Sequence, residues 1–376
     1  MKKYYIIALL GLVIFMASFK IHQDYNIDLL RKQYSSTHYS TWPKPELDTT
    51  ASINFKDIGA LGAIIFPENN PYSEEKKTLG KILFFDPRLS KSGQIACASC
   101  HDSEIGWGDG RRASYGHSRQ LGRRNSMTIL NVAYAKNLFW DGRAKSLEEQ
   151  VNFPIKDTLE MNFHINLAAN VISNIEGYKP FFEKAFGNFE VTESKIRMAI
   201  ATYERSIVSG STKFDKFITG NSNIYSDDEV LGLHLFRTKA RCINCHNTKY
   251  FSDNQFHNTG LTYYGRSFED LGLYEVTGKK DDVGKFKTST LREISRTKPY
   301  MHNGLFPNLK GIVNLYNAGM PKPKRKKNQL KDTLFPKTSP LLKKLHLTPK
   351  EQNALIAFLK TLESRNTRET PPILPN

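Results

Sequence analysis

Apolar residues recur at helical spacing in several parts of this 376-residue chain. Residues 193–208 predict one helix, since apolar side chains repeat there every three or four positions. Its apolar face is formed by Ile196, Ile200, Tyr203 and Ile207. Another helix is expected to lead into Cys242, and a third begins after Thr348, where Thr-Pro-Lys-Glu combines a capping box with proline at the first helical position. Strand patterns are sparse, so the chain is predicted to be mainly α, with long irregular loops.

The N-terminus carries a different pattern. Two lysines precede an apolar run over residues 4–19, which is typical of a secretory signal peptide or an N-terminal anchor. We assign this role to residues 1–20; no small-x-small cleavage site follows, so an uncleaved anchor stays open. Residues 21–51 are polar and contain two prolines, and we expect them to form a tether. The protein is therefore expected to be periplasmic or otherwise exported, either free or anchored to the membrane.

The candidate chemistry lies in two copies of one motif, which together use all four cysteines of the chain. The copies are Cys97-Ala98-Ser99-Cys100-His101 and Cys242-Ile243-Asn244-Cys245-His246. In such a motif the two thiols add to the vinyl groups of one porphyrin, and the histidine ligates the iron. We therefore predict two covalently bound c-type haems, which agrees with export. The alternative, a zinc site or a redox Cys-x-x-Cys, requires further ligands in a compact cluster.

The spacing of the motifs indicates how the chain is divided. They lie 145 positions apart, which favours one haem per domain. We assign an N-terminal domain to residues 52–210, a C-terminal domain to residues 211–364 and a tail to residues 365–376. The expected fold is two tandem cytochrome c-type haem domains. Long loops suit this fold, because the porphyrin supplies apolar core that a small helical domain otherwise lacks.

The net charge of +17 predicts a basic surface, with its densest run at residues 322–327. For a haem protein this run favours an acidic electron carrier as partner, and the alternative is a solvated basic loop. No motif of a nucleic-acid-binding protein is present, so that class of partner is not expected.

Several segments, in order along the chain, resemble the bacterial dihaem cytochrome c peroxidase and MauG family. They include Gly116-His117, Arg124-Asn125, Phe139-Trp140-Asp141-Gly142-Arg143-Ala144, Leu291-Arg292 and Pro299-Tyr300-Met301-His302-Asn303-Gly304. The resemblance covers roughly residues 52–362. It implies an exported enzyme that reduces hydrogen peroxide at the first haem with electrons relayed through the second. Ser289, where proline is common in the family, is a minor departure.

The resemblance assigns roles around the first haem. His101 is the implied proximal ligand, and Glu160 the distal carboxylate that moves protons as the O–O bond breaks. Gln150 is implied to orient peroxide, and Trp140 to relay electrons between the haems. The ordinary alternatives are a surface carboxylate, a helix-surface amide and a packed core indole.

At the second haem the family divides into branches. His246 is the implied proximal ligand, and the sixth ligand of the peroxidases is a methionine fourteen residues after the histidine of the Pro-Tyr-x-His segment. That position is Tyr316 here, as in the MauG-like branch. A tyrosinate stabilises ferric and higher states, whereas a thioether favours ferrous iron. The alternative is that Tyr316 is a packed aromatic residue and that Met320 or Met301 supplies a thioether.

Two further features are implied. His117 matches a loop histidine that caps the first haem in peroxidases of the family until the second haem is reduced; otherwise it is an exposed loop residue. The family's calcium site, built largely of carbonyl oxygens, maps to Asn125, Thr297 and Pro299. His257, His302 and Arg292 are assigned supporting roles around the second haem.

Three functions follow as hypotheses. The first is a peroxidase that takes electrons from a small cytochrome or cupredoxin. The second is a MauG-like oxidase that uses peroxide to oxidise aromatic residues of a protein, or another organic substrate. The third is a dihaem electron carrier without enzyme activity. The sequence also leaves a homodimer open.

Overall fold

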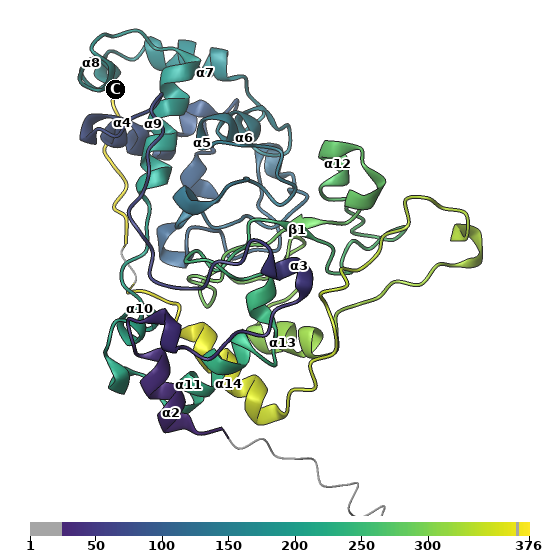
Figure 1. Cartoon of the computed structure of the whole chain (residues 1–376). Helices are drawn as coiled ribbons and strands as arrows, with labels where there is room; N and C mark the ends of the chain where they lie inside the picture. The colour runs from purple at the N-terminus through teal and green to yellow at the C-terminus, as the bar shows by residue number, and fades with distance from the viewer. Residues whose placement is uncertain (1–24, 366–367) are drawn as a thin grey trace, which may run out of the picture.

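The computed structural model describes residues 25–365 and 368–376, which form two helical lobes with irregular segments between them (Figure 1). The strands within these ranges are one short antiparallel pair, β1 (Phe256–His257) with β2 (Phe286–Lys287). The predicted mainly α fold is therefore confirmed. The signal or anchor predicted for residues 1–20 lies outside the described residues. Within the described ranges no helix is both long and apolar enough to cross a membrane.

The first lobe is built around two crossed helices, α4 (Glu74–Phe85) and α9 (Glu193–Ser206). Ser73 and Thr192 cap them by accepting a backbone N–H of the first turn. Gly80 lies at the crossing, where a Cβ would come within 1.9 Å of the backbone oxygen of Ala199. Any larger residue would push the helices apart. The remaining helices are α5 (Leu147–Gln150), α6 (Asn152–Lys156), α7 (Ile165–Ser173) and α8 (Lys179–Phe186).

The second lobe repeats this crossing with α11 (Asp227–Arg237) and α14 (Pro349–Lys360). A Cβ at Gly232 would come within 2.0 Å of the backbone oxygen of Ala354. The predicted capping box forms between Thr348 and Glu351. The other helices of this half are α10 (Lys213–Ile218), α12 (Tyr274–Thr277) and α13 (Leu309–Asn317), with α3 (Thr49–Ser52) in the segment that precedes the first lobe. The two lobes are thus copies of one helix-crossing unit, each with its own hydrophobic core.

Residues 25–51, the described part of the segment 21–51 that was expected to be a tether, are instead folded against the second lobe; residues 21–24 lie outside the described residues. α2 (Ile27–Tyr34) buries Leu30 against that lobe and contacts α11. The guanidinium of Arg237 lies 5.0 Å from the ring centre of Trp42, which is itself buried. The tether prediction is corrected here. A short helix with few buried residues has a weak apolar pattern, and the surface it covers exists only in the folded chain.

The chain end returns to the first lobe, far from α14 (Figure 1). Arg88 donates a hydrogen bond to the backbone oxygen of Pro375 at 2.9 Å, and the N–H of Gly177 donates to that of Asn376 at 3.0 Å. Leu374 packs on the first core. The last residues therefore connect the C-terminal end of the chain to the N-terminal domain.

Candidate active site

Both Cys-x-x-Cys-His motifs face one cavity of about 910 Å³, whose walls come from both lobes. Each motif begins in a single 3-10 turn, and the N–H of each motif histidine donates to the carbonyl of the first cysteine, at 3.1 Å for His101 and 2.9 Å for His246. This turn presents two sulfurs and one imidazole to the same cavity. The lining residues of the two motifs are Cys97, Cys100, His101, Cys242, Cys245 and His246.

The two motif histidines are oriented in the same way. Nδ1 of His101 lies 3.0 Å from the carbonyl oxygen of Trp107, and Nδ1 of His246 lies 3.1 Å from that of Phe251. A carbonyl can only accept, so Nδ1 carries the proton and Nε2 keeps its lone pair. Burial lowers the pKa of both imidazoles and keeps them neutral. A neutral Nε2 with a fixed ring is the form that ligates iron.

The residues around the motifs fit two c-type haems better than a zinc site. In the described part of the chain, one cluster of His, Cys and carboxylate side chains is compact enough for a metal ion, namely Cys245, Asp253 and His257. It contains one of the four cysteines, whereas both full motifs face the shared cavity. Nε2 of His257 lies 2.7 Å from Asp253, so these two side chains satisfy each other.

Glu160 and Gln150, the two residues expected to meet peroxide, both line the cavity. Burial raises the pKa of Glu160 to about 7, with Asp157 raising it further and Arg143 opposing the shift. A carboxyl group that titrates near neutral pH can both accept and return a proton. Glu160 follows α6 in an irregular segment, whereas Gln150 is the last residue of α5.

His117 lies beside Glu160 without lining the cavity. Among the described residues that form the wall, Gly116 belongs to this loop and His117 does not. The N–H of His117 donates to the backbone oxygen of Glu160 at 2.6 Å. Nδ1 of His117 is buried and has no hydrogen-bond partner in the described part of the chain. The loop is therefore bonded to the Glu160 segment, and the imidazole does not contribute to the cavity wall formed by the described residues.

Trp140 makes one hydrogen bond within the first lobe and two contacts with the second. Its indole N–H donates to the backbone oxygen of Asn125 at 2.9 Å, and its own backbone oxygen accepts from Lys287 at 2.8 Å. Its ring centre lies 6.3 Å from that of His302, which stacks on Phe286 at 3.6 Å. Trp140 also lines the cavity. It is therefore a first-domain side chain seated against the second domain.

Tyr316, near the C-terminal end of α13, lines the cavity next to the second motif. Burial, with smaller contributions from Cys245 and Cys242, raises the pKa of its hydroxyl well above the usual value. Met301 also lines the cavity, whereas the wall formed by the described residues does not include Met320, which is buried elsewhere. The geometry leaves Tyr316 and Met301 as candidates to face the second haem.

The three residues assigned to calcium all belong to the cavity wall. Asn125, Thr297 and Pro299 line the cavity. The side-chain N–H of Asn125 donates to the backbone oxygen of Arg111 at 2.8 Å, which leaves its Oδ1 as the atom for a cation. The backbone N–H of Asn125 donates to the backbone oxygen of His302 at 2.8 Å, so Asn125 also joins the two domains.

Comparison with known proteins agrees with this geometry. Residues 74–223 match the family model described as di-haem cytochrome c peroxidase. Methylamine utilization protein MauG of Methylorubrum extorquens is 35% identical over 336 residues, covering 87% of this chain and 91% of the relative. The chain belongs to the dihaem cytochrome c peroxidase and MauG family.

Other members of this family are similarly close. Cytochrome c551 peroxidase of Nitrosomonas europaea is 37% identical over 312 residues, covering 83% of this chain and 85% of the relative. The crystal structure of a MauG-like protein associated with microbial copper homeostasis is similar with a TM-score of 0.72 at 30% identity, covering 81% of this chain and 93% of that one. As a dihaem peroxidase family member, the protein is an oxidoreductase that acts on peroxide, and its two motifs fit two c-type haems.

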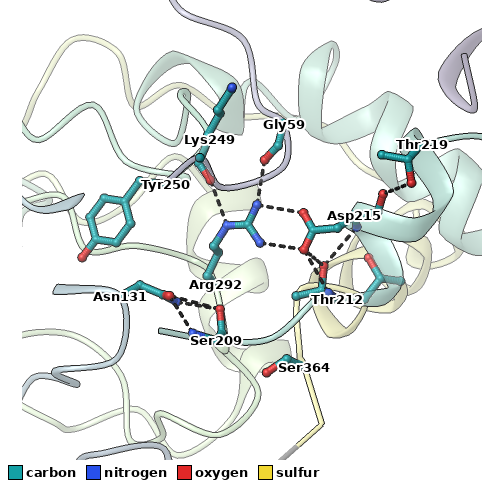
Figure 2. Close-up of polar contacts among 12 residues, drawn as sticks. Gly59, Asn131, Ser209, Thr212, Asp215, Thr219, Lys249, Tyr250, Arg292 and Ser364 are labelled. Atoms are coloured by element: carbon teal, nitrogen blue, oxygen red, sulfur yellow. Dashed lines mark hydrogen bonds and ion pairs between the residues drawn. The ribbon is translucent and has the colours of Figure 1, made fainter. Parts of the chain in front are cut away.

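Arg292 has a more specific place than the supporting role expected from the sequence (Figure 2). Its fully buried guanidinium forms two bonds to the Asp215 carboxylate, at 3.0 and 3.1 Å, and donates to the backbone oxygens of Gly59 and Lys249. The backbone oxygen of Tyr250, the next residue, accepts from the Thr290 hydroxyl. The backbone oxygen of Phe251 accepts from Nδ1 of His246. Arg292 and Asp215 thus hold the loop that orients His246.

An ion cluster beside Trp140 could not be predicted from the sequence. Arg124 pairs with Asp270 through two bonds of 2.7 Å, and also with Asp141 and Glu275. Arg124 and Asp141 belong to segments already matched to the family, but Asp270 and Glu275 are distant in sequence. No local pattern brings these four side chains together. The cluster connects the two domains at the tryptophan.

Proposed function

We propose that this family member is an exported dihaem peroxidase of the MauG-like branch. Peroxide would be reduced in the first domain, and electrons would reach it from the second domain through Trp140. The bound haems would supply iron that takes peroxide at one site and exchanges electrons with a donor at the other. The balanced reaction is H₂O₂ with two electrons and two protons giving two waters. The observation that carries this proposal is the single cavity that both motifs, Glu160, Trp140 and Tyr316 line.

Glu160 would accept and return protons during peroxide reduction in the first domain. Peroxide must lose a proton from one oxygen and gain one on the other, and a buried carboxylate with a pKa of about 7 can do both. Gln150, on the same wall, would hold the peroxide by its amide. The position of His117 outside the wall supports a first site that is open without prior reduction.

Tyr316 is the residue that favours the MauG-like branch. It faces the cavity near Cys245 and Cys242, whereas Met320 does not line the wall formed by the described residues. Met301 stays the competing thioether. An anionic phenolate ligand would lower the reduction potential of the second haem. That haem would then be suited to share the oxidising equivalents of peroxide with the first.

The electron source divides the two enzyme hypotheses. In the peroxidase a small acidic cytochrome or cupredoxin would supply both electrons. Residues 322–344 contain nine Lys and Arg and one Asp, and lysines 322, 324, 326 and 327 are exposed. The arm they form projects from the second lobe (Figure 1), and residues 339–345 of the same segment contribute to the cavity wall. An acidic carrier held there would lie beside the second haem. In the MauG-like oxidase the electrons would come from aromatic residues of a protein or from another organic donor.

We also propose one calcium ion at Asn125, Thr297 and Pro299. The free Oδ1 of Asn125 and backbone carbonyls are oxygen donors of the kind that calcium takes. Because Asn125 also accepts the indole N–H of Trp140, calcium would fix the indole between the domains. Export would place the site where calcium is plentiful.

One experiment separates the hypotheses. The diferric protein is mixed with peroxide in the absence of reductant and followed by absorption and electron paramagnetic resonance. A long-lived oxidised state supports the proposal, and a need for prior one-electron reduction supports the reductively activated branch. Two low-spin haems that ignore peroxide, even after partial reduction, support the electron carrier and overturn the enzyme assignment of the site.

A further inference from the structure

Glu204 is a buried carboxyl group of the first lobe that the proposed mechanism does not use. It lies on α9, is only 4% exposed and lines the shared cavity. Its Oε2 is buried without a hydrogen-bond partner among the described residues. Native proteins rarely bury an unpaired carboxyl group, because the charged form loses its hydration. Such a group calls for an explanation beyond packing.

The helix crossing of the second lobe identifies the residue that is equivalent to Glu204. Gly80 meets Ala199 and Tyr203, and Gly232 meets Ala354 and Phe358 in the same order. The residue after Tyr203 is Glu204, and the residue after Phe358 is Leu359. Leu359 is buried and also lines the cavity. The fold therefore accepts a leucine here, and the glutamate is a feature of the first, peroxide-facing domain.

The surroundings of Glu204 favour a carboxyl group that holds a proton at neutral pH. Burial raises its pKa to about 8, Arg205 on the same helix opposes the shift, and Glu148 of α5 adds to it. The Arg205 guanidinium is already engaged by both oxygens of Glu148, at 2.9 and 3.0 Å. On the cavity side, burial and then the Glu204 carboxylate raise the pKa of the Cys97 thiol, so this carboxyl lies close to a haem-attachment residue.

We propose that Glu204 is a proton-transfer group coupled to electron transfer at the first haem. It would hold a proton while that site is reduced, pass the proton toward the peroxide oxygens as one of the two electrons leaves the site, and regain a proton from solvent when that electron is returned by the donor. Glu204 would supply one proton for one of the two electrons, so that electron would leave the site without a gain of net charge beside it. The physical reason is that a positive charge gained in an enclosed, weakly screened cavity favours the ionised carboxylate. The inference rests on the proposal that peroxide reacts in the first domain.

The test measures the reduction potential of the first haem as a function of pH in the holoprotein, from about pH 6 to about pH 9.5, where the carboxyl group changes charge. In the wild type the potential falls as pH rises through this range. In Glu204→Gln and Glu204→Leu the slope above about pH 7.5 is lost, whereas the contribution of Glu160, whose pKa is about 7, remains at lower pH. Glu183→Gln, which removes an exposed carboxylate of the same lobe, keeps the wild-type slope. A wild-type slope in Glu204→Gln, or an equal loss in Glu183→Gln, overturns the inference.

Unfolding provides a second measurement that is independent of turnover. The folded pKa of about 8 lies above the unfolded value near 4.5, so stability due to this proton is complete below pH 4.5 and is lost as pH rises to about 8. Glu204→Leu lacks this loss and is more stable than the wild type at pH 8. If the Glu204→Leu protein does not fold and bind haem, the same measurements are made on Glu204→Gln, whose side chain has the size of glutamate. If the wild-type protein does not react with peroxide, the proposed function is contradicted. The pH dependence of the reduction potential would still test the role of Glu204.

Discussion

The backbone N–H of His117 donates to the backbone oxygen of Glu160 at 2.6 Å. The loop that carries a potential sixth ligand is thus bonded to the segment that carries the proposed proton-transfer group. Gly116 lies against the same segment, with no room for a Cβ. A movement of the His117 backbone toward the first motif would break this contact and shift Glu160. Capping the site and disabling its carboxylate would therefore be one event.

Gly116→Ala is expected to disturb this contact. A Cβ would lie 2.1 Å from the backbone oxygen of Leu159 and 2.6 Å from Cα of Glu160, so the carboxylate segment must shift. We expect the second-order rate constant for peroxide to fall by about tenfold or more, since a small displacement of a catalytic group is costly. Gly122→Ala is the control, because its Cβ would make only an ordinary contact at 3.4 Å. Equal rates for the two variants would contradict the prediction.

Glu160→Gln should slow the reaction with peroxide by about 10²- to 10⁴-fold, the usual contribution of a general base. Since only the ionised carboxylate accepts a proton and its pKa is about 7, the wild-type rate should rise with pH through neutrality and level off above it. In the variant this rise should disappear. Stopped-flow measurement of the peroxide reaction between pH 5 and 9 checks both statements. An unchanged pH profile would remove Glu160 from the mechanism.

Replacement of Tyr316 distinguishes the candidate sixth ligands of the second haem. Tyr316→Phe should remove the phenolate signature from the absorption spectrum of the ferric protein, and Tyr316→Met should raise the reduction potential of that haem, since a thioether favours ferrous iron. Met301→Leu is the matched control at the same cavity wall. If Met301→Leu alters the spectrum of the second haem and Tyr316→Phe leaves it unchanged, the ligand is Met301.

The pair formed by Arg292 and Asp215 should be required for a single, well-ordered second site. Asp215→Asn leaves a fully buried guanidinium without its carboxylate, which typically costs about 3–5 kcal/mol of folding stability. The change should also broaden or shift the spectrum of the second haem, because the loop behind His246 loses its support. Asp227→Asn breaks an exposed pair with Arg31 and should cost at most about 1 kcal/mol. Chemical denaturation and low-temperature absorption spectra measure the two effects.

Reversal of charge on the basic arm should slow electron delivery by an acidic donor. We expect the triple variant Lys322→Glu, Lys324→Glu, Lys327→Glu to lower the second-order rate constant with a negatively charged cupredoxin by about tenfold or more at low salt, and the difference should shrink at about 0.15 M salt. The control triple variant Lys91→Glu, Lys179→Glu, Lys184→Glu makes the same charge change at exposed positions of the first lobe. A small-molecule reductant should reduce all three proteins equally. Similar rates for both triple variants with the cupredoxin would exclude the arm as the docking site.

Much of the chemistry was readable from the sequence, because it depends on residues close together in the chain. The spacing within Cys97 to His101 is sufficient for thioether attachment and iron ligation, whatever the fold around it. The capping box at Thr348 is equally local, since both of its hydrogen bonds form within one helical turn. Glu160 and Trp140 were identified by their resemblance to a family and line the cavity. Their proposed roles still await the tests described above.

Other features depend on contacts between distant residues, and no local pattern encodes them. Leu30 and Trp42 lie in a polar stretch whose few apolar side chains become core only when α11 is beside them. Glu204 is one ionisable residue in a regular helix. Only the tertiary structure shows that its side chain is buried and that its Oε2 has no hydrogen-bond partner among the described residues. Hydrophobic spacing determines that a helix forms, since it depends on neighbours one turn away. Tertiary structure decides which side chains lose water and which charges meet, because those energies depend on surfaces joined across hundreds of residues.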